Sequence, residues 1–201
     1  ANTEAMELHN GESKWSRNIR SQTMRLSGLM QNLLTLAKME EMGGEKEKFP
    51  YTDFSMSQLL TETLQPYYES AALKNIAIHE EIAAGVDVHA SRENLIQLLS
   101  ILFDNAVKYA SEGGYIDVSL KKSGRELVLQ VKNTCEKLPE VEPEKLFERF
   151  YRGDAARTQK SGGYGIGLSA VRAIALAHGG TLGASYEKDN VICFTLRLKE
   201  T

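Results

Sequence analysis

A glycine-rich stretch near the C-terminus offers the clearest arrangement for binding chemistry. Residues 162–168 read Gly-Gly-Tyr-Gly-Ile-Gly-Leu and run directly into an apolar pattern of helical spacing that stops at Gly179 and Gly180. Closely spaced glycines allow successive backbone N–H groups to turn toward one point, and a helix N-terminus adds the positive end of its dipole. The stretch therefore favours an anion cradle, most often for phosphate. A plain hinge before a helix has the same glycine pattern, so the assignment depends on what the other elements supply.

A second set of polar residues lies on the long helix expected after Ser91. Asn105, Lys108 and Tyr109 follow Ile101 at spacings of four, three and one, on a stripe distinct from the apolar face of that helix. Asparagine offers a carbonyl oxygen to a hard cation such as Mg²⁺, and lysine offers positive charge to phosphate. The pair favours a magnesium–phosphate site, although two solvated side chains would produce the same pattern.

Composition sets the limits within which these residues act. The chain has 201 residues and a formal net charge of −3, so it forms one or two domains and is not built for broad nucleic-acid binding. Its two cysteines, Cys135 and Cys193, fit neither a metal spacing nor a disulfide framework and are interpreted as reduced thiols. The sequence contains no signal peptide and no apolar run long enough to span a bilayer. We expect a soluble chain, whether whole or cut from a longer membrane protein.

The first 48 residues are organised around one helix. Apolar residues over 14–41 alternate steps of four and three, which is the spacing of a heptad seam that requires a partner helix. This pattern favours a bundle or a dimer over a helix packed on its own domain. Glycines at 43–44 and alternating charges at 45–48 then predict a hinge. The boundary therefore separates residues 1–48 from a second domain at 49–201. The seam residues are Trp15, Ile19, Gln22, Leu26, Leu29, Leu33 and Leu36.

The second domain alternates strands and helices. Short strands are expected near 51–54, 76–78 and 86–88, a hairpin at 115–120 and 127–131, and two final strands at 182–186 and 191–198. Ser55 and Gln58 predict a capping box, Pro66 a helix kink, and Ser91 a helix cap. Residues 133–165 form an irregular stretch with one short helix at Pro143, which is interpreted as a lid. This order predicts an α/β sandwich, in which helices cover one face of a mixed, mostly antiparallel sheet.

Three segments together resemble a known family. Residues 104–109 (Asp-Asn-Ala-Val-Lys-Tyr), 146–152 (Leu-Phe-Glu-Arg-Phe-Tyr-Arg) and 163–168 (Gly-Tyr-Gly-Ile-Gly-Leu) are similar to the N, F and G2 boxes of the ATP-binding domain of bacterial sensor histidine kinases. They occur in that family's order and spacing, over roughly residues 50–200. Residues 33–40 resemble the second helix of its dimerisation and phosphotransfer domain. The resemblance implies the histidine-kinase-type ATPase fold, with ATP and Mg²⁺ as ligands.

The resemblance also implies roles for individual residues. Asn105 would ligate Mg²⁺, and Lys108 and Tyr109 would touch the phosphates. The G2 segment, with Gly163, Gly165, Gly167 and Leu168, would hold the β- and γ-phosphates through its backbone amides. Arg152 would reach the γ-phosphate as the catalytic residue. Charge neutralisation and positioning of this kind are what phosphoryl transfer requires.

The base-binding G1 box departs from the family pattern. Asn133 replaces the aspartate that accepts a hydrogen bond from the adenine amino group, and its amide oxygen retains that capacity without the charge. Cys135 and Lys137 replace both glycines of the motif, which leaves weaker nucleotide affinity open. Ile101 stands where hydrolytic relatives carry a glutamate base, which fits a kinase better than an ATPase.

The acceptor histidine of the family has no counterpart in this chain. It lies on the first phosphotransfer helix and is followed by an acidic residue and usually by a proline a few residues on, and none of the histidines here has that whole context: His9, His79, His89 and His178. We therefore expect a fragment that follows the acceptor helix and does not autophosphorylate alone. In the intact protein, the resemblance implies a cytoplasmic domain of a membrane sensor, a homodimer through the heptad helix, and a response regulator as partner. A degenerate signal-relay module without catalysis is the alternative. A serine kinase of the anti-sigma type is disfavoured by the heptad helix.

Overall fold

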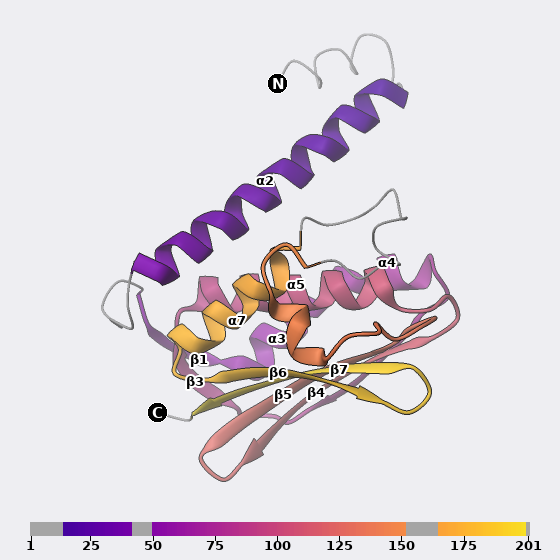
Figure 1. The fold of residues 1–201 in the computed structure, drawn as a ribbon. Helices are drawn as coiled ribbons and strands as arrows, with labels where there is room; N and C mark the ends of the chain where they lie inside the picture. Colours follow the sequence, from indigo (N-terminus) through magenta and orange to yellow (C-terminus); the bar gives the residue numbers. More distant parts are fainter. Residues whose placement is uncertain (1–13, 42–49, 152–164, 200–201) are drawn as a thin grey trace.

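The computed structural model describes residues 14–41, 50–151 and 165–199. The sandwich expected from the sequence is present, with its helices in one layer and its main sheet in another (Figure 1). The helices are α2 (Lys14–Glu41), α3 (Met56–Leu64), α4 (Tyr67–Ala72), α5 (Arg92–Tyr109) and α7 (Gly167–Ala177), with a 3₁₀ turn, η2, at Pro143–Phe147. The strands are β1 (Thr52–Ser55), β2 (Ala77–Ile82), β3 (Asp87–Ala90), β4 (Tyr115–Ser123), β5 (Glu126–Thr134), β6 (Thr181–Glu187) and β7 (Val191–Lys199).

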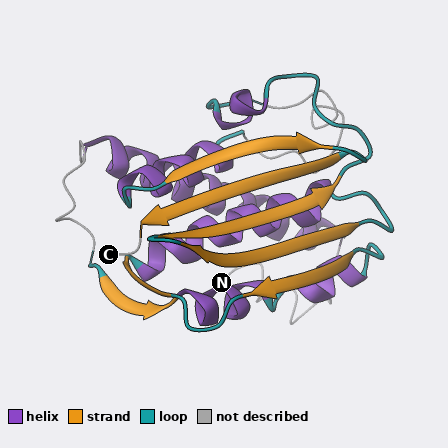
Figure 2. Ribbon diagram, turned by 90° about the horizontal axis from the view of Figure 1, so that it is seen from below, coloured by secondary structure: helices purple, strands orange, loops and turns teal. Residues whose placement is uncertain are grey.

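The main sheet has five strands in the order β2-β4-β5-β7-β6. Strands β2 and β4 are parallel, and the other neighbours are antiparallel, as in the predicted mixed sheet. Figure 2, seen from below, shows the strands in front and the helices behind them. Strands β1 and β3, which were expected as part of the same layer, form a separate antiparallel pair.

The core lies between the sheet and α5. Residues on β5 alternate between half-buried and buried, so that Leu127, Leu129, Val131 and Asn133 all project to the helical side. Helix α5 meets them with Leu98, Leu99 and Leu102, each no more than 1% exposed. Other packed residues extend this core without a break from α3 to β7. Apolar packing therefore holds α5 in place, and this sets the positions of the polar residues at its C-terminal end.

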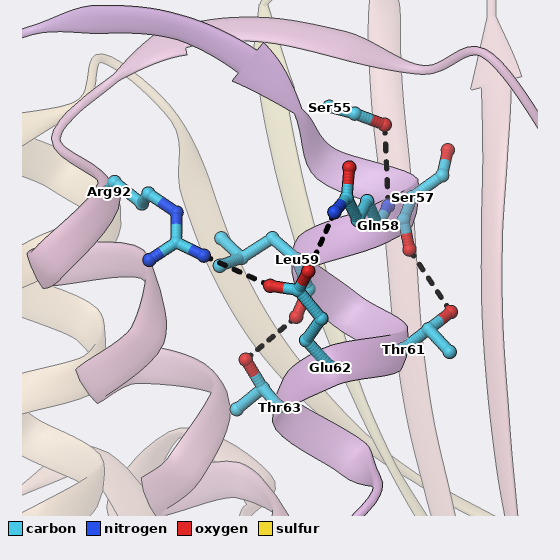
Figure 3. Close-up of polar contacts among 8 residues, drawn as sticks. All are labelled: Ser55, Ser57, Gln58, Leu59, Thr61, Glu62, Thr63 and Arg92. Atoms are coloured by element: carbon cyan, nitrogen blue, oxygen red, sulfur yellow. Dashed lines mark hydrogen bonds and ion pairs between the residues drawn. The ribbon is translucent and has the colours of Figure 1, made fainter.

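Helix α3 begins at the cap that the sequence predicted, but only half of the capping box forms. The hydroxyl of Ser55 accepts a hydrogen bond from the backbone N–H of Gln58 at 3.3 Å (Figure 3). The side chain of Gln58 does not return to Ser55; it donates to Glu62 at 2.7 Å. Arg92, at the start of α5, also pairs with Glu62 at 3.0 Å. A competing partner one helical turn away explains why the reciprocal bond is missing.

Two further predictions about helix ends need correction. Pro66 does not kink one helix but separates α3 from α4, because it stands at the N-cap of the second helix. Ser91 occupies the N-cap position of α5, but its side chain makes no capping hydrogen bond. Its backbone N–H instead donates to His178 Nε2 at 3.2 Å. The first turn of α5 is thus tied to the end of α7.

Among the described residues, helix α2 packs through the C-terminal end of its heptad seam. Leu36 is 5% exposed and packs with Ile166 and Ala170 at the start of α7. Beside this contact, Gln97 of α5 donates to Asn32 at 3.2 Å and accepts from the hydroxyl of Thr35 at 3.0 Å. The other end of the seam is open, with Trp15 at 79% exposure. Among the helices that the structure describes, none is both long and apolar enough to cross a membrane.

Candidate functional site

The glycine turn before α7 is built so that only glycine fits. Gly165 has a φ of +72°, in the left-handed region that residues with a side chain avoid. A Cβ on Gly165 would lie 2.6 Å from the carbonyl oxygen of Tyr151 and 2.7 Å from the carbonyl carbon of Phe150. The backbone is therefore packed against backbone at this turn. The first amides of α7 follow directly, and amides at a helix N-terminus have no acceptor within the helix and can bind an anion.

Helix α7 begins directly against α5. Gly167 is its first residue, and a Cβ there would lie 3.1 Å from the Cγ2 of Ile101. Asn105 follows Ile101 by one helical turn, which is about 6 Å along the axis. The fold thus brings the glycine turn, the positive end of α7 and the polar stripe of α5 to one place. Leu168, half-buried, continues α7 from there.

The polar residues of α5 remain accessible at this place. Asn105 is half-buried, and its amide has no hydrogen-bond partner among the described residues. The Nζ of Lys108 lies 4.8 Å from the ring centre of Tyr109, a cation–π contact that holds the ammonium near the helix end. The Tyr109 side chain itself is 38% exposed. An unpartnered amide beside a placed ammonium is a suitable donor set for a metal-bound phosphate.

Charges around the end of α5 favour an anion. Lys74 donates through Nζ to the carbonyl of Val107 at 2.7 Å, so a second ammonium caps the helix beside Lys108. Partial burial raises the pKa of Asp104, and a hydrogen bond from Tyr67 and the charge of Lys108 oppose that rise. The pKa of Tyr67 is raised by its burial and by the nearby Asp104. Lys74 is a neighbour that the sequence did not reveal, because it lies in the loop before β2.

The residue that was expected to meet the nucleotide base lies near the end of β5. Asn133 is 1% exposed and projects to the helical side of the sheet. Cys135, which follows it, is half-buried, and that burial raises the pKa of its thiol. Near it, the hydroxyl of Tyr186 is buried without a partner among the described residues. Burial, with Tyr151 and Cys135 close by, raises the pKa of Tyr186 to about 12. An orphaned hydroxyl of this kind fits a pocket wall that meets a polar ligand.

Within the stretch 133–165 that was expected to be a lid, residues 152–164 lie outside the described residues, and the described residues on either side of them are in contact. The backbone N–H of Phe150 donates to the carbonyl of Gly165 at 2.8 Å, and Phe150 itself has a φ of +63°. The 3₁₀ turn before it is fixed to α7, because Arg172 pairs with Glu144 at 2.9 Å and lies over the ring of Phe147. Phe147 in turn packs edge-on against Phe194 of β7.

Most of the residues predicted from the sequence lie in or near this region. Gly167 contacts Ile101, one helical turn before Asn105 on α5, and Gly165 packs on Phe150 and Tyr151. Lys108 and Tyr109 lie farther along α5, and Asn133 lies near the end of β5. Arg152 and Gly163 lie outside the described residues. Sequence reasoning missed Ile166, whose burial against Leu36 anchors the turn. The apolar side chain of Ile166 between Gly165 and Gly167 was the sequence feature that could have predicted this buried contact.

Comparison with known proteins identifies the family. Residues 90–201 match the model for the histidine kinase-, DNA gyrase B- and HSP90-like ATPases. Sensor histidine kinase RppB of Synechocystis is 28% identical over 182 residues, which cover 90% of this chain and 39% of RppB. Sensor histidine kinase WalK of Bacillus subtilis is 40% identical over 117 residues, covering 56% of this chain and 19% of WalK. The chain thus spans less than half the length of either relative.

The histidine kinase ThkA provides a structural counterpart. Its nucleotide-free catalytic domain matches with a TM-score of 0.68 and 26% identity, over 76% of this chain and 97% of that domain. In a complex with the response regulator TrrA, ThkA matches with a TM-score of 0.69 and 23% identity, over 100% of this chain and 56% of ThkA. The family match covers more than half of the chain. The chain therefore belongs to the histidine kinase-, DNA gyrase B- and HSP90-like ATPases, as a catalytic ATP-binding domain of the bacterial sensor histidine kinase type.

Proposed function

We propose that this chain binds ATP with Mg²⁺ and passes the γ-phosphoryl group to a histidine on a helix outside it, for relay to a response regulator. The observation that carries this proposal is the contact between Gly167 and Ile101. It sets the N-terminus of α7 against the helix that carries Asn105 one turn later and Lys108 after that, which supports a shared site for its backbone amides, the Asn105 oxygen and the Lys108 ammonium. Bound Mg²⁺ would neutralise charge on the phosphates.

Each residue contributes positioning or charge. Asn105 offers Oδ1 to the cation, because no described neighbour occupies it. Gly165 and Gly167 present their turn and helix N-terminus to the phosphates, and Lys108 supplies a point charge. Arg152 and Gly163 are assigned by family resemblance alone, with Arg152 facing the γ-phosphate.

The position of Ile101 favours transfer to a side chain over hydrolysis. Its side chain is apolar and packs at the start of α7. It therefore cannot remove a proton from water at the point where hydrolytic relatives place a glutamate. An acceptor histidine carries its own nucleophilic nitrogen and has no need of such a base.

The partners follow from the family and from α2. The complex of ThkA with TrrA supports a response regulator as partner. The open seam of α2, from Trp15 to Leu26, supports a homodimer in the intact protein. We also propose that residues 1–48 and 49–201 are separate domains, on the cytoplasmic side of a membrane sensor.

A non-catalytic relay module is the second candidate, favoured by Cys135 and Lys137 in place of two glycines. Titration with ATP, with and without Mg²⁺, distinguishes the two. We expect Mg²⁺-dependent binding in the native chain. Absence of binding at millimolar ATP in a folded sample would leave only the relay module.

The role of Asn105 is tested with a matched control on the same helix. Asn105→Ala removes the proposed ligand, and the dependence of ATP affinity on Mg²⁺ should disappear. Gln97→Ala, two turns earlier and directed at α2, should retain it. Equal Mg²⁺ dependence in folded Asn105→Ala and native protein would contradict the assignment.

A further inference from the structure

The last turn of α5 is left open by the backbone around it. The N–H of Ala110 donates to the carbonyl of Ala106 at 2.8 Å, but the chain then turns away, and the N–H of Ser111 donates to a carbonyl at the end of β5 at 3.2 Å. Among the described residues, no backbone N–H donates to the carbonyl of Val107 or of Lys108. Carbonyls at a helix C-terminus that lack a backbone partner need a donor from elsewhere.

Lys74 supplies that donor from the loop between α4 and β2. Its Nζ lies 2.7 Å from the carbonyl oxygen of Val107 and 3.5 Å from that of Lys108. A cation at this position also faces the negative end of the helix dipole. The Lys74 ammonium therefore binds the two carbonyls that the backbone leaves open.

The backbone of Lys74 is itself held in a closed turn at the end of α4. Asn75 has a φ of +55°, and the N–H of Ile76 donates to the carbonyl of Ala71 at 3.0 Å. A left-handed residue followed by such a bond closes a helix in the Schellman motif. On its other side, the carbonyl of Lys74 accepts from the N–H of Gly113, in the loop after α5, at 3.3 Å. These bonds fix the place from which the side chain reaches α5.

The turn that Lys74 binds carries a residue of the proposed phosphate site. Lys108 is half-buried, and its Nζ lies 4.8 Å from the ring centre of Tyr109. The ends of helices fray where their terminal groups are not satisfied. Fraying of this turn would let the Lys108 ammonium move away from the phosphates.

We propose that Lys74 is a positioning residue, which holds the last turn of α5 through the carbonyls of Val107 and Lys108 and so keeps the Lys108 ammonium in place for the phosphates of the nucleotide. This inference rests on the proposed function, because it concerns the phosphates bound at that site. It assigns Lys74 an effect on affinity that is transmitted through Lys108.

A direct contact between Lys74 and a phosphate is the competing interpretation, because an ammonium has three donors and the two carbonyls engage two of them. The interpretations differ in how the effect of Lys74 depends on Lys108. If Lys74 acts by placing Lys108, its removal changes little once the Lys108 ammonium is gone. Two independent contacts with the phosphates would add instead.

The experiment measures dissociation constants for ATP with Mg²⁺ by calorimetry on the chain as it stands. Lys74→Met keeps the apolar stem and loses the ammonium, and it should weaken binding about fivefold. Lys108→Met should weaken binding further, because it removes the charge that meets the phosphates. In the double variant, the loss should exceed that of Lys108→Met alone by less than about twofold.

A matched control removes a lysine elsewhere. Lys121, at the end of β4 away from the loop that contacts Lys74, is exposed and pairs with Glu81 at 2.8 Å. Lys121→Met makes the same change in net charge and should bind ATP as the native protein does. Thermal unfolding without nucleotide checks that each variant is folded. Lys74→Gln loses the charge and the reach to the carbonyls, and it repeats each comparison with a polar side chain.

Hydrogen exchange tests the holding of the turn without any nucleotide. The amide of Ala110 donates within this turn, so Lys74→Met should speed its exchange about threefold or more, because the turn opens more often. Lys121→Met should leave that exchange unchanged. Native exchange at Ala110 in folded Lys74→Met would overturn the inference.

The binding outcomes separate the inference from the proposed function. If Lys74→Met weakens ATP binding equally with and without Lys108, or not at all, the inference is wrong while the proposed function stands. Weaker binding by Lys121→Met of the same size would also overturn it, since net charge would then explain the loss. If the native chain binds no ATP at millimolar concentration, the proposed function fails and takes the inference with it.

Discussion

Replacing Gly165 by alanine tests whether the glycine turn binds the phosphates of ATP. Two separate effects oppose a side chain there. The φ of +72° imposes a backbone strain of about 1 kcal/mol on a non-glycine residue. In addition, the new Cβ would lie within 2.9 Å of three backbone atoms of Phe150 and Tyr151. Backbone cannot rotate away as a flexible side chain can, so the turn must shift.

A second glycine separates the strain from the clash. Gly124, in the β4–β5 hairpin, has a φ of +63° and open space around the position of a Cβ. Gly124→Ala should therefore cost about 1 kcal/mol alone, which lowers the unfolding midpoint by about 2–4 °C in a chain of this size. Gly165→Ala should cost at least as much and should also displace the Phe150–Gly165 hydrogen bond.

Nucleotide affinity is the deciding measurement. We expect Gly165→Ala to weaken binding of ATP with Mg²⁺ by tenfold or more, because amides moved by about an ångström no longer meet the phosphates. Gly124→Ala, about equally strained but distant from the site, should bind ATP as the native protein does. If folded Gly165→Ala bound ATP with Mg²⁺ as tightly as the native protein does, the assignment of this turn as the phosphate-binding site would be refuted.

Three further predictions concern packing, pH and a buried hydroxyl. Leu36→Ala, at 5% exposure, should cost about 2 kcal/mol and release the C-terminal half of α2, seen as faster hydrogen exchange, whereas Leu34→Ala, at 58%, should change neither. Burial lowers the pKa of His178, so unfolded chains bind more protons below about pH 6.5 and stability falls as the pH is lowered. His178→Gln should reduce the loss of melting temperature between pH 7 and 5.5; an unchanged slope would place its origin elsewhere. Tyr186→Phe removes an unpartnered buried hydroxyl and should raise the free energy of unfolding by up to about 1 kcal/mol, and a clear loss of stability would reveal a partner.

Sequence patterns predicted most of the elements because those elements are local. The β4–β5 hairpin follows from period-two alternation and a glycine turn, and both are complete within residues 115–134. The start of α3 follows from Ser55 for the same reason. Where partners are distant, the patterns failed: Ser91 gives its N–H to His178, and the side chain of Gln58 goes to Glu62.

The candidate site shows the same division. Asn105 and the glycines could be named from residue types and spacing, because their chemistry depends on what they are. That Asn105 and the start of α7 lie on adjacent helices could not be predicted in this way, since it depends on the packing of α7 against Ile101. The orientation of Asn133 was also out of reach, because it is set by the carbonyl of Thr134 and the thiol of Cys135. Nor did the heptad pattern indicate that Leu36 would pack on α7 while Trp15 stays exposed.

The hydrogen bond between Phe150 and Gly165 has a consequence for how this architecture tolerates change in chain length. It joins two positions that are fixed by their own contacts, Phe150 following the anchored 3₁₀ turn and Gly165 preceding α7. The entropic cost of joining two fixed positions through a chain segment grows only with the logarithm of the segment's length, at about 0.6 kcal/mol for each doubling. Insertions or deletions between the two positions should therefore cost the sheet and its helices little. The number of residues between Phe150 and Gly165 can therefore change with function while the free energy of unfolding changes little.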